Sequence, residues 1–151
     1  MIHMTRRGAL GLAGAALLAT GSAYAEPVDD GTWSKHPLWP TLKKTRLAAD
    51  QNGMVRAAFT PEVSSLSGKA MTISGFILPI EASKRYNHFI LSRYSPECPF
   101  CPSGGPTEVI EVFTDKAVGP TPALVTMRGT FSVQDNMEAG LFYRMKGGVL
   151  V

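Results

Sequence analysis

Residues 124–133 alternate between apolar and polar side chains, and this pattern constrains the fold more than any other feature of the chain. The polar positions 126, 128, 130 and 132 hold Thr, Arg, Thr and Ser, and the positions between them hold Val125, Met127, Gly129, Phe131 and Val133. Successive side chains of a β-strand point to opposite faces of its sheet. The pattern therefore predicts a strand with one buried face and one solvated face.

Four further segments after residue 69 have the composition and alternation of strands, and short links join them. They are residues 70–78, 86–94, 108–114 and 141–145. Gly75 interrupts the first of them and predicts a bulge or a sharp bend. Because a sheet of five short strands must bury one face and protect its edges, we expect a mainly β fold, namely a small closed or nearly closed antiparallel barrel.

In the part of the chain before these strands, we expect only short helices. Residues 26–60 are expected to form an irregular N-terminal arm, in which a short helix over residues 39–49 turns Leu42 and Leu47 inward. Asn52-Gly53 predicts a turn within this arm.

The barrel domain is expected to span residues 61–151, and a helix of one or two turns opens it. Thr60 has the side chain of a helix N-cap, and Pro61 suits the first helical position. Gly68 predicts the end of this helix.

Residues 1–25 predict a cleavable export signal. Arg6 and Arg7 supply its positive charge, residues 9–20 form an uncharged apolar run, and residues 23–25 read Ala-Tyr-Ala, a cleavage signature. The apolar run is shorter than the ~20 residues of a membrane span. We therefore expect a periplasmic protein that keeps no stable membrane anchor after cleavage. The run Thr-Arg-Arg-Gly-Ala-Leu resembles a twin-arginine signal, and an ordinary Sec signal is the alternative.

Charge and motifs exclude several classes of function. Two of the 15 Lys and Arg residues lie in the predicted signal, so the mature chain has 13 basic and 12 acidic residues and a net charge near +1. This balance gives no basic face for nucleic acid. The chain has no Ser/His/Asp arrangement, Gly-rich phosphate loop or HExxH motif. We therefore expect a protein that is not an enzyme.

The two cysteines, Cys98 and Cys101, form a CxxC motif, and in an exported protein such a pair has three uses. A structural disulfide is the default in an oxidising compartment, although it closes a very short loop and stabilises little by entropy. A thioredoxin-like dithiol needs a helix after the first cysteine, and the following Pro-Ser-Gly-Gly-Pro-Thr cannot begin one. A slower redox role stays open.

The third use is metal binding, because two thiolates at this spacing can chelate zinc or copper(I). His88, on the predicted strand before the motif, is the candidate third ligand beside Cys98 and Cys101. The alternative for His88 is a strand histidine bonded to a neighbouring carbonyl. His36 and Glu97 are weaker candidates, and His36 is better explained as a solvated residue.

Several segments resemble the strands of an OB-like barrel. Residues 66–76 look like its opening strand, and residues 125–131 and 140–145 resemble its fourth and fifth strands. With Trp39, the Gly-Phe-Ile-Leu-Pro run at 75–79 and the CxxC, residues 33–151 are similar to a family of exported bacterial proteins known as a domain of unknown function.

This resemblance implies an OB-like, non-enzymatic periplasmic protein, often encoded beside ABC-transporter genes and suspected of metal handling. The function expected on this basis is that of a binding or accessory protein, with a membrane transporter or another periplasmic protein as partner. Two alternatives remain: a thiol-disulfide redox protein that uses the same CxxC, and a protein-interaction module with a structural disulfide.

Overall fold

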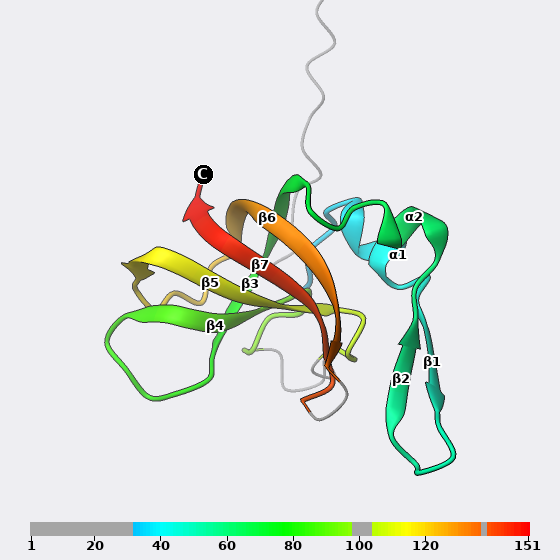
Figure 1. Ribbon diagram of the computed structural model, residues 1–151. Helices are drawn as coiled ribbons and strands as arrows, with labels where there is room; N and C mark the ends of the chain where they lie inside the picture. Colours follow the sequence, from blue (N-terminus) through cyan, green and yellow to red (C-terminus); the bar gives the residue numbers. More distant parts are fainter. Residues whose placement is uncertain (1–31, 98–103, 137–138) are drawn as a thin grey trace, which may run out of the picture.

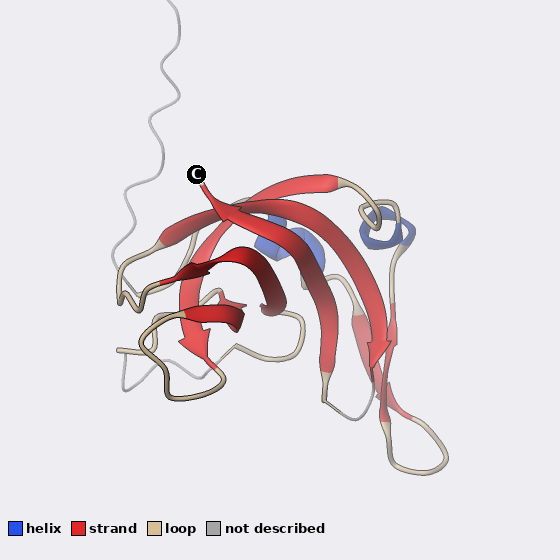
Figure 2. Cartoon of the chain, turned by 60° about the vertical axis from the view of Figure 1, so that its left-hand side comes forward, coloured by secondary structure: helices blue, strands red, loops and turns tan. Residues whose placement is uncertain are grey.

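The structure is a computed structural model that describes residues 32–97, 104–136 and 139–151. Its described elements are two short helices and seven strands (Figure 1). Five of the strands form a closed barrel, and the other two form a separate hairpin that projects away from it (Figure 2). The predicted mainly β fold with a small barrel is confirmed. The predicted signal peptide lies outside the described residues and stays a prediction.

The barrel strands follow the order β3-β4-β5-β7-β6 around the ring. Their bounds are Ala70–Pro79 (β3), Tyr86–Ser92 (β4), Val109–Val118 (β5), Val125–Asn136 (β6) and Leu141–Leu150 (β7). β5 and β7 pair in parallel, whereas the other neighbours are antiparallel. The predicted antiparallel pairing thus holds at four of the five interfaces. One interface must be parallel, because strand direction cannot alternate at every interface of a closed ring that contains an odd number of strands.

Gly75 marks the point at which β3 changes its neighbour. Residues 70–75 of β3 pair with β6, and residues 76–79 pair with β4. A Cβ on Gly75 would lie 2.7 Å from the backbone oxygen of Ser92 and 2.8 Å from Leu91 Cγ. The predicted interruption at this glycine is therefore a close backbone approach, where the strand bends from one side of the barrel to the other.

One continuous core fills the barrel. Alternate residues of β6 point into it, and Met127 and Phe131 are fully buried, as the alternation predicted. Ile73, Phe89 and Ile110 contribute from the three strands that precede β6. This core is the main source of stability, because each such side chain contributes about 1.5–3 kcal/mol on burial.

Helix α1 (Leu38–Leu42) covers part of this core with Trp39 and Leu42. The prediction that this helix continues to residue 49 was wrong. Residues 46–49 instead form strand β1, which pairs with β2 (Val55–Ala58) around a turn at Gly53. Leu47 is 38% exposed on the hairpin, so it does not face inward.

Helix α2 (Pro61–Ser64) begins as predicted. The side chain of Thr60 accepts a hydrogen bond from the backbone N–H of Val63, and Pro61 occupies the first turn. Gly68 has a φ of 82°, which suits glycine and ends the segment. Val63 is fully buried and joins the same core as α1.

Three strands, β5, β6 and β7, end at least three residues later than the sequence indicated, and β6 continues to Asn136. β5 continues to Val118, and β7 runs through Gly147 and Gly148 to Leu150. Across the described part of the chain, the helices are all too short or too polar to cross a membrane.

Candidate functional site

A buried ion pair joins the two ends of the segment that contains Cys98 and Cys101. Arg93 follows β4, Glu108 precedes β5, and Arg93 Nη1 lies 2.9 Å from Glu108 Oε1. Both side chains are only 11% exposed. The backbone N–H of Arg93 also donates to the carbonyl oxygen of Glu108. The residues that flank the CxxC segment are therefore fixed to each other by backbone and side chain.

Two further donors reach the same carboxylate. Tyr94 donates its hydroxyl to Glu108 Oε1 at 3.0 Å, and Lys43 Nζ lies 3.2 Å from that oxygen. The guanidinium of Arg93 lies over the ring of Trp33, 4.6 Å from its centroid. These contacts tie the segment before α1 to the ends of β4 and β5, and they form what we call the Arg93 cluster.

The surroundings of Glu108 favour its ionised form. Burial raises the pKa of this carboxyl group, but the hydrogen bonds from Arg93, Lys43 and Tyr94 outweigh burial and hold the pKa below its usual value. The pKa of Tyr94 is raised by burial and by its hydrogen bond to Glu108. Tyr94 is thus a neutral donor, and the cluster has the character of a structural network rather than of a proton-transfer site.

His88 belongs to a second cluster on the outer face of β4 and β5. His88 Nε2 lies 2.9 Å from Glu111 Oε1, and the imidazole stacks on Phe113 with 4.2 Å between ring centroids. Arg144 Nη2 lies 2.7 Å from Glu111 Oε2, and its guanidinium lies 5.4 Å from the Phe113 centroid. The partner of His88 is thus a carboxylate, and not the carbonyl that the sequence suggested.

The position of His88 bears on metal binding. His88 pairs with Phe113 in the β4–β5 ladder, and the ladder ends nearest the cysteines at Ser92 and Val109. His88 is four residues from that end of the ladder, and four residues of strand span about 13 Å, so a ligand of the cysteines would have to reach back over this distance to meet it. Ligation by His88 would also require its Nε2 atom to leave Glu111. The metal role of His88 stays a prediction.

The other predicted ligands lie apart from His88. Cys98 and Cys101 are outside the described residues. Glu97 lines a surface pocket, and its backbone N–H donates to Ser95 Oγ. His36 Nδ1 accepts from the backbone N–H of Leu38 at the start of α1, so it has a local structural role. Within the described ranges, no three His, Cys, Asp or Glu side chains form a group that could hold a metal ion.

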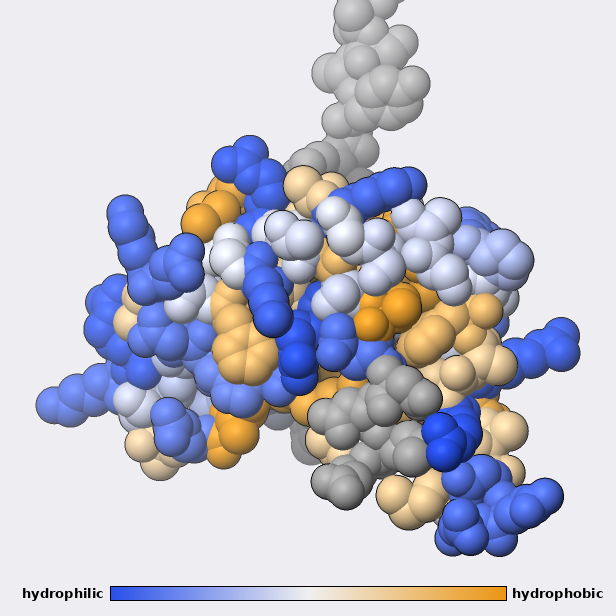
Figure 3. All heavy atoms as spheres, viewed as in Figure 1, coloured by the Kyte–Doolittle hydropathy of each residue, from blue (hydrophilic) through white to orange (hydrophobic). Residues whose placement is uncertain are grey.

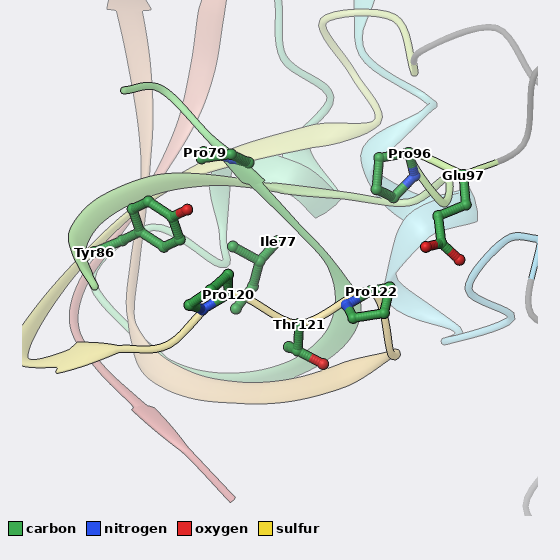
Figure 4. Close-up of a pocket in the computed structure, with 8 residues that line it drawn as sticks. All are labelled: Ile77, Pro79, Tyr86, Pro96, Glu97, Pro120, Thr121 and Pro122. Atoms are coloured by element: carbon green, nitrogen blue, oxygen red, sulfur yellow. The ribbon is translucent and has the colours of Figure 1, made fainter. Parts of the chain in front are cut away.

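The pocket that Glu97 lines is mainly apolar and has a volume of about 270 Å³ (Figure 4). It lies between the residues just before the cysteines and the segment that follows β5. Its lining residues are Ile77, Pro79, Tyr86, Pro96, Glu97, Pro120, Thr121 and Pro122. Of these, only Glu97 carries a charge, at the end of the pocket away from Tyr86 (Figure 4).

Sequence reasoning missed both clusters. Their carboxylates, Glu108 and Glu111, each bind a different arginine. Arg93 and Arg144 are separated from their partners by 15 and 33 residues. No local motif marks pairs at such separations, since only the barrel register brings them together.

The aromatic residues Tyr86, Phe131 and Tyr143 are buried and belong to the core. Tyr94 instead belongs to the Arg93 cluster.

No family model matches the chain, and no curated protein sequence matches it. Among solved structures, the chain is similar to a DUF3299 family protein from Pseudomonas aeruginosa, with a TM-score of 0.50 and 23% sequence identity. The match covers 63% of this chain and 67% of that chain. It agrees with a resemblance to a bacterial domain of unknown function, and at this identity the likeness shows the fold alone.

Proposed function

We propose that this chain is an exported, non-enzymatic binding module with an OB-like barrel, and that the segment with Cys98 and Cys101 is its binding element. The Arg93–Glu108 pair is the observation that carries the proposal. It fixes the residues on either side of the cysteines, so that a ligand of the two thiolates would meet a site whose flanks are already ordered. Five-stranded Greek-key barrels of this kind commonly bind ligands through their loops and outer strand faces.

The ligand proposed for the two thiolates is zinc or copper(I), and the setting proposed is metal handling beside a membrane transporter in the periplasm. Thiolates suit both ions. Among the described residues, Glu97 is next to the motif, and His88 is the nitrogen donor on the preceding strand. The proposal requires Cys98 and Cys101, and it treats His88 as a further ligand to be tested separately.

Elemental analysis tests the metal. The mature chain would be purified reduced and without oxygen, and loaded with Zn²⁺ or Cu(I). Close to one equivalent of retained metal in the native chain, and none in the double variant Cys98→Ser/Cys101→Ser, is the expected result. Equal retention by both proteins, or no retention by either, would overturn the metal proposal.

A matched pair of variants tests His88. If His88 is a ligand, His88→Ala weakens metal binding, whereas Glu111→Gln leaves it unchanged or stronger because it weakens the contact that holds Nε2. Equal affinity in His88→Ala and the native chain would remove His88 from the ligand set.

A protein-interaction module with a structural disulfide is the second candidate, and the well-ordered flanks of the cysteine segment favour it as much as they favour a metal site. Mass measurement of the air-purified chain separates the two, because a disulfide lowers the mass by two hydrogen atoms and a metal adds its own mass. A reduction potential below about −300 mV would identify a structural bond, and a higher one would support the redox alternative.

A further inference from the structure

The interface between β5 and β7 has the shortest ladder in the barrel. Only two residue pairs join these strands, Glu111 with Arg144 and Val112 with Met145. By comparison, β3 and β6 are joined by six consecutive pairs. Beyond Val112 and Met145, β5 and β7 continue next to each other without a regular ladder.

β5 leaves its regular path just after this ladder. Its pairing with β4 skips from Phe113 to Val118, while β4 advances by only two residues. Two carbonyl groups of this bulge accept hydrogen bonds from Asn87 of β4 and from Arg85, the residue that precedes β4. Asn87 Nδ2 donates to the carbonyl oxygen of Thr114 at 3.0 Å, and the guanidinium of Arg85 donates to that of Ala117. The bulge is therefore a fixed feature of the strand.

β7 is irregular at the same level. Its pairing with β6 shifts between Lys146 and Val149, and Gly147 has a φ of 61°. Gly148 packs closely on β5, because a Cβ there would lie 3.0 Å from Val112 Cγ1 and 3.2 Å from Thr114 Cγ2. The two strands thus remain in contact at Gly148, and the irregular stretches leave a hollow on the outer surface.

Two cavities follow one another along this interface. The first, of about 460 Å³, is lined by residues 113–115 of β5 and by Arg144, Lys146 and Gly147. The second, of about 370 Å³, is lined by residues 116–119, by residues 148–150 and by Arg85. Together they form what we call the seam groove. Along β7 the groove runs from Arg144 to Leu150, which pair with Ser132 and Met127 of β6. Five steps of strand span about 17 Å, which is long for a small ion and suits an extended peptide.

The walls of the seam groove are mainly basic. Arg85, Lys116 and Lys146 are exposed at it, and Asp115 is the one acidic side chain among the residues that line the two cavities. Neither lysine forms an ion pair with another described residue. Arg144 adds a fourth positive charge, which Glu111 balances.

The far end of the seam groove is also apolar. Val149 and Leu150 are 43% and 50% exposed, and they are among the largest apolar side chains on the described surface. In the space-filling view, hydrophilic side chains cover much of the left-hand part of the face, with smaller hydrophobic areas between them (Figure 3). A ligand of this groove therefore needs negative charges, and apolar groups at one end.

We propose that the seam groove binds an extended acidic segment of a partner protein that also carries apolar side chains at one end. The acidic side chains would meet Lys116 and Lys146, and the apolar ones would pack on Val149 and Leu150. This site goes beyond the proposed binding element, because it uses none of the residues that flank the cysteines. A chain of this kind could hold a ligand at one place and a partner protein at another.

The test uses a fluorescein-labelled octapeptide of four Asp residues followed by four Val residues, with the peptide of four Lys residues followed by four Val residues as control. Fluorescence anisotropy at low salt should show binding of the Asp peptide and none of the Lys peptide. The double reversal Lys116→Glu/Lys146→Glu should weaken binding at least tenfold. A matched reversal of two exposed basic residues elsewhere, Arg46→Glu/Lys69→Glu, should leave the affinity within twofold.

The position of the peptide is checked by amide shifts in the NMR spectrum of the labelled native chain. Shifts confined to residues 113–119 and 144–150 support the proposal, and so does binding that weakens as salt is raised. Equal loss of affinity in both double variants would overturn it, because the effect would then be one of net charge. Equally tight binding of free succinate at the same amides would identify a small dicarboxylate, and not a peptide, as the ligand.

Discussion

Tyr143 and Thr45 connect the last strand of the barrel to the N-terminal segment through a buried hydrogen bond. The hydroxyl group of Tyr143, on β7, lies 2.6 Å from Thr45 Oγ1 and also donates to the carbonyl oxygen of Leu42 at 2.7 Å. Burial raises the pKa of Tyr143, so this group is neutral at any physiological pH. The contact spans about a hundred residues of sequence and joins α1 to the barrel.

We expect Tyr143→Phe to lower the free energy of unfolding by about 1–3 kcal/mol, because it leaves the Leu42 carbonyl and the Thr45 hydroxyl without their buried partner. Chemical denaturation measures this change. Tyr86→Phe is the matched control, since Tyr86 is also buried but makes no side-chain hydrogen bond within the described residues. Equal effects of the two substitutions would contradict the role given to the Tyr143 hydroxyl group.

The second prediction concerns the buried ion pair. Glu108→Ala should lower the free energy of unfolding by about 3 kcal/mol, because it leaves the Arg93 guanidinium buried without its main partner. Arg93→Met/Glu108→Met should recover much of that loss, since two apolar side chains need no partner. Lys43→Ala, which removes an exposed partner of the same carboxylate, should cost less than about 1 kcal/mol. A double variant less stable than Glu108→Ala would argue against this account.

The third prediction is a pH dependence that arises from Glu108. The pKa of Glu108 is lower in the folded chain than its ordinary value of 4.5. A carboxyl group of this kind stabilises the fold above its unfolded-state pKa, and this stability is lost as pH falls through the folded-state pKa. The melting temperature of the native chain should therefore exceed that of Glu108→Gln near pH 7. The two should converge as the pH falls below 4.5.

Circular dichroism at a series of pH values measures this convergence. Glu62→Gln serves as control, because Glu62 forms an exposed ion pair with Lys44 and such pairs contribute little. A difference between native chain and Glu108→Gln that persists unchanged at the lowest pH would show that the carboxylate charge is not its cause.

The fourth prediction tests the close approach at Gly129. A Cβ there would lie 2.6 Å from Met145 Cγ and 2.9 Å from the backbone oxygen of Lys146. Gly129→Ala should therefore push β6 from β7 and lower the free energy of unfolding by about 1–3 kcal/mol. Gly119→Ala, where no atom lies within 4 Å, should be tolerated. Equal stability of both variants in urea would mean that β6 and β7 can separate at no cost.

The sequence was informative where a residue's environment depends on its near neighbours. Thr60 caps its helix and residues 125–133 alternate across a sheet because both effects act within a few residues. Helix α1 was predicted too long, because nothing local distinguishes a continued helix from the strand that begins at Arg46. There the pairing with β2 decides the structure.

The polar clusters could not be predicted for a related reason. Glu111 contacts both His88 and Arg144 because of the register of β4 and β7 against β5. A shift of one residue would turn the Glu111 side chain to the other face of the sheet. The parallel β5–β7 pair was not predicted either, although a closed ring of five strands requires at least one such pair. The cysteines lie outside the described residues, so their role stays a prediction.

Ser74 gives the N-terminal segment a part in folding that its sequence does not suggest. Its carbonyl oxygen, next to the bend of β3 at Gly75, accepts from Ser34 Oγ at 2.7 Å and from Trp39 Nε1 at 2.8 Å. These donors are made some forty residues earlier in synthesis. Their hydrogen bonds to Ser74 can therefore form only after β3 has been synthesised. A fragment that began at Pro61 would lack both donors to this carbonyl oxygen at the bend of β3.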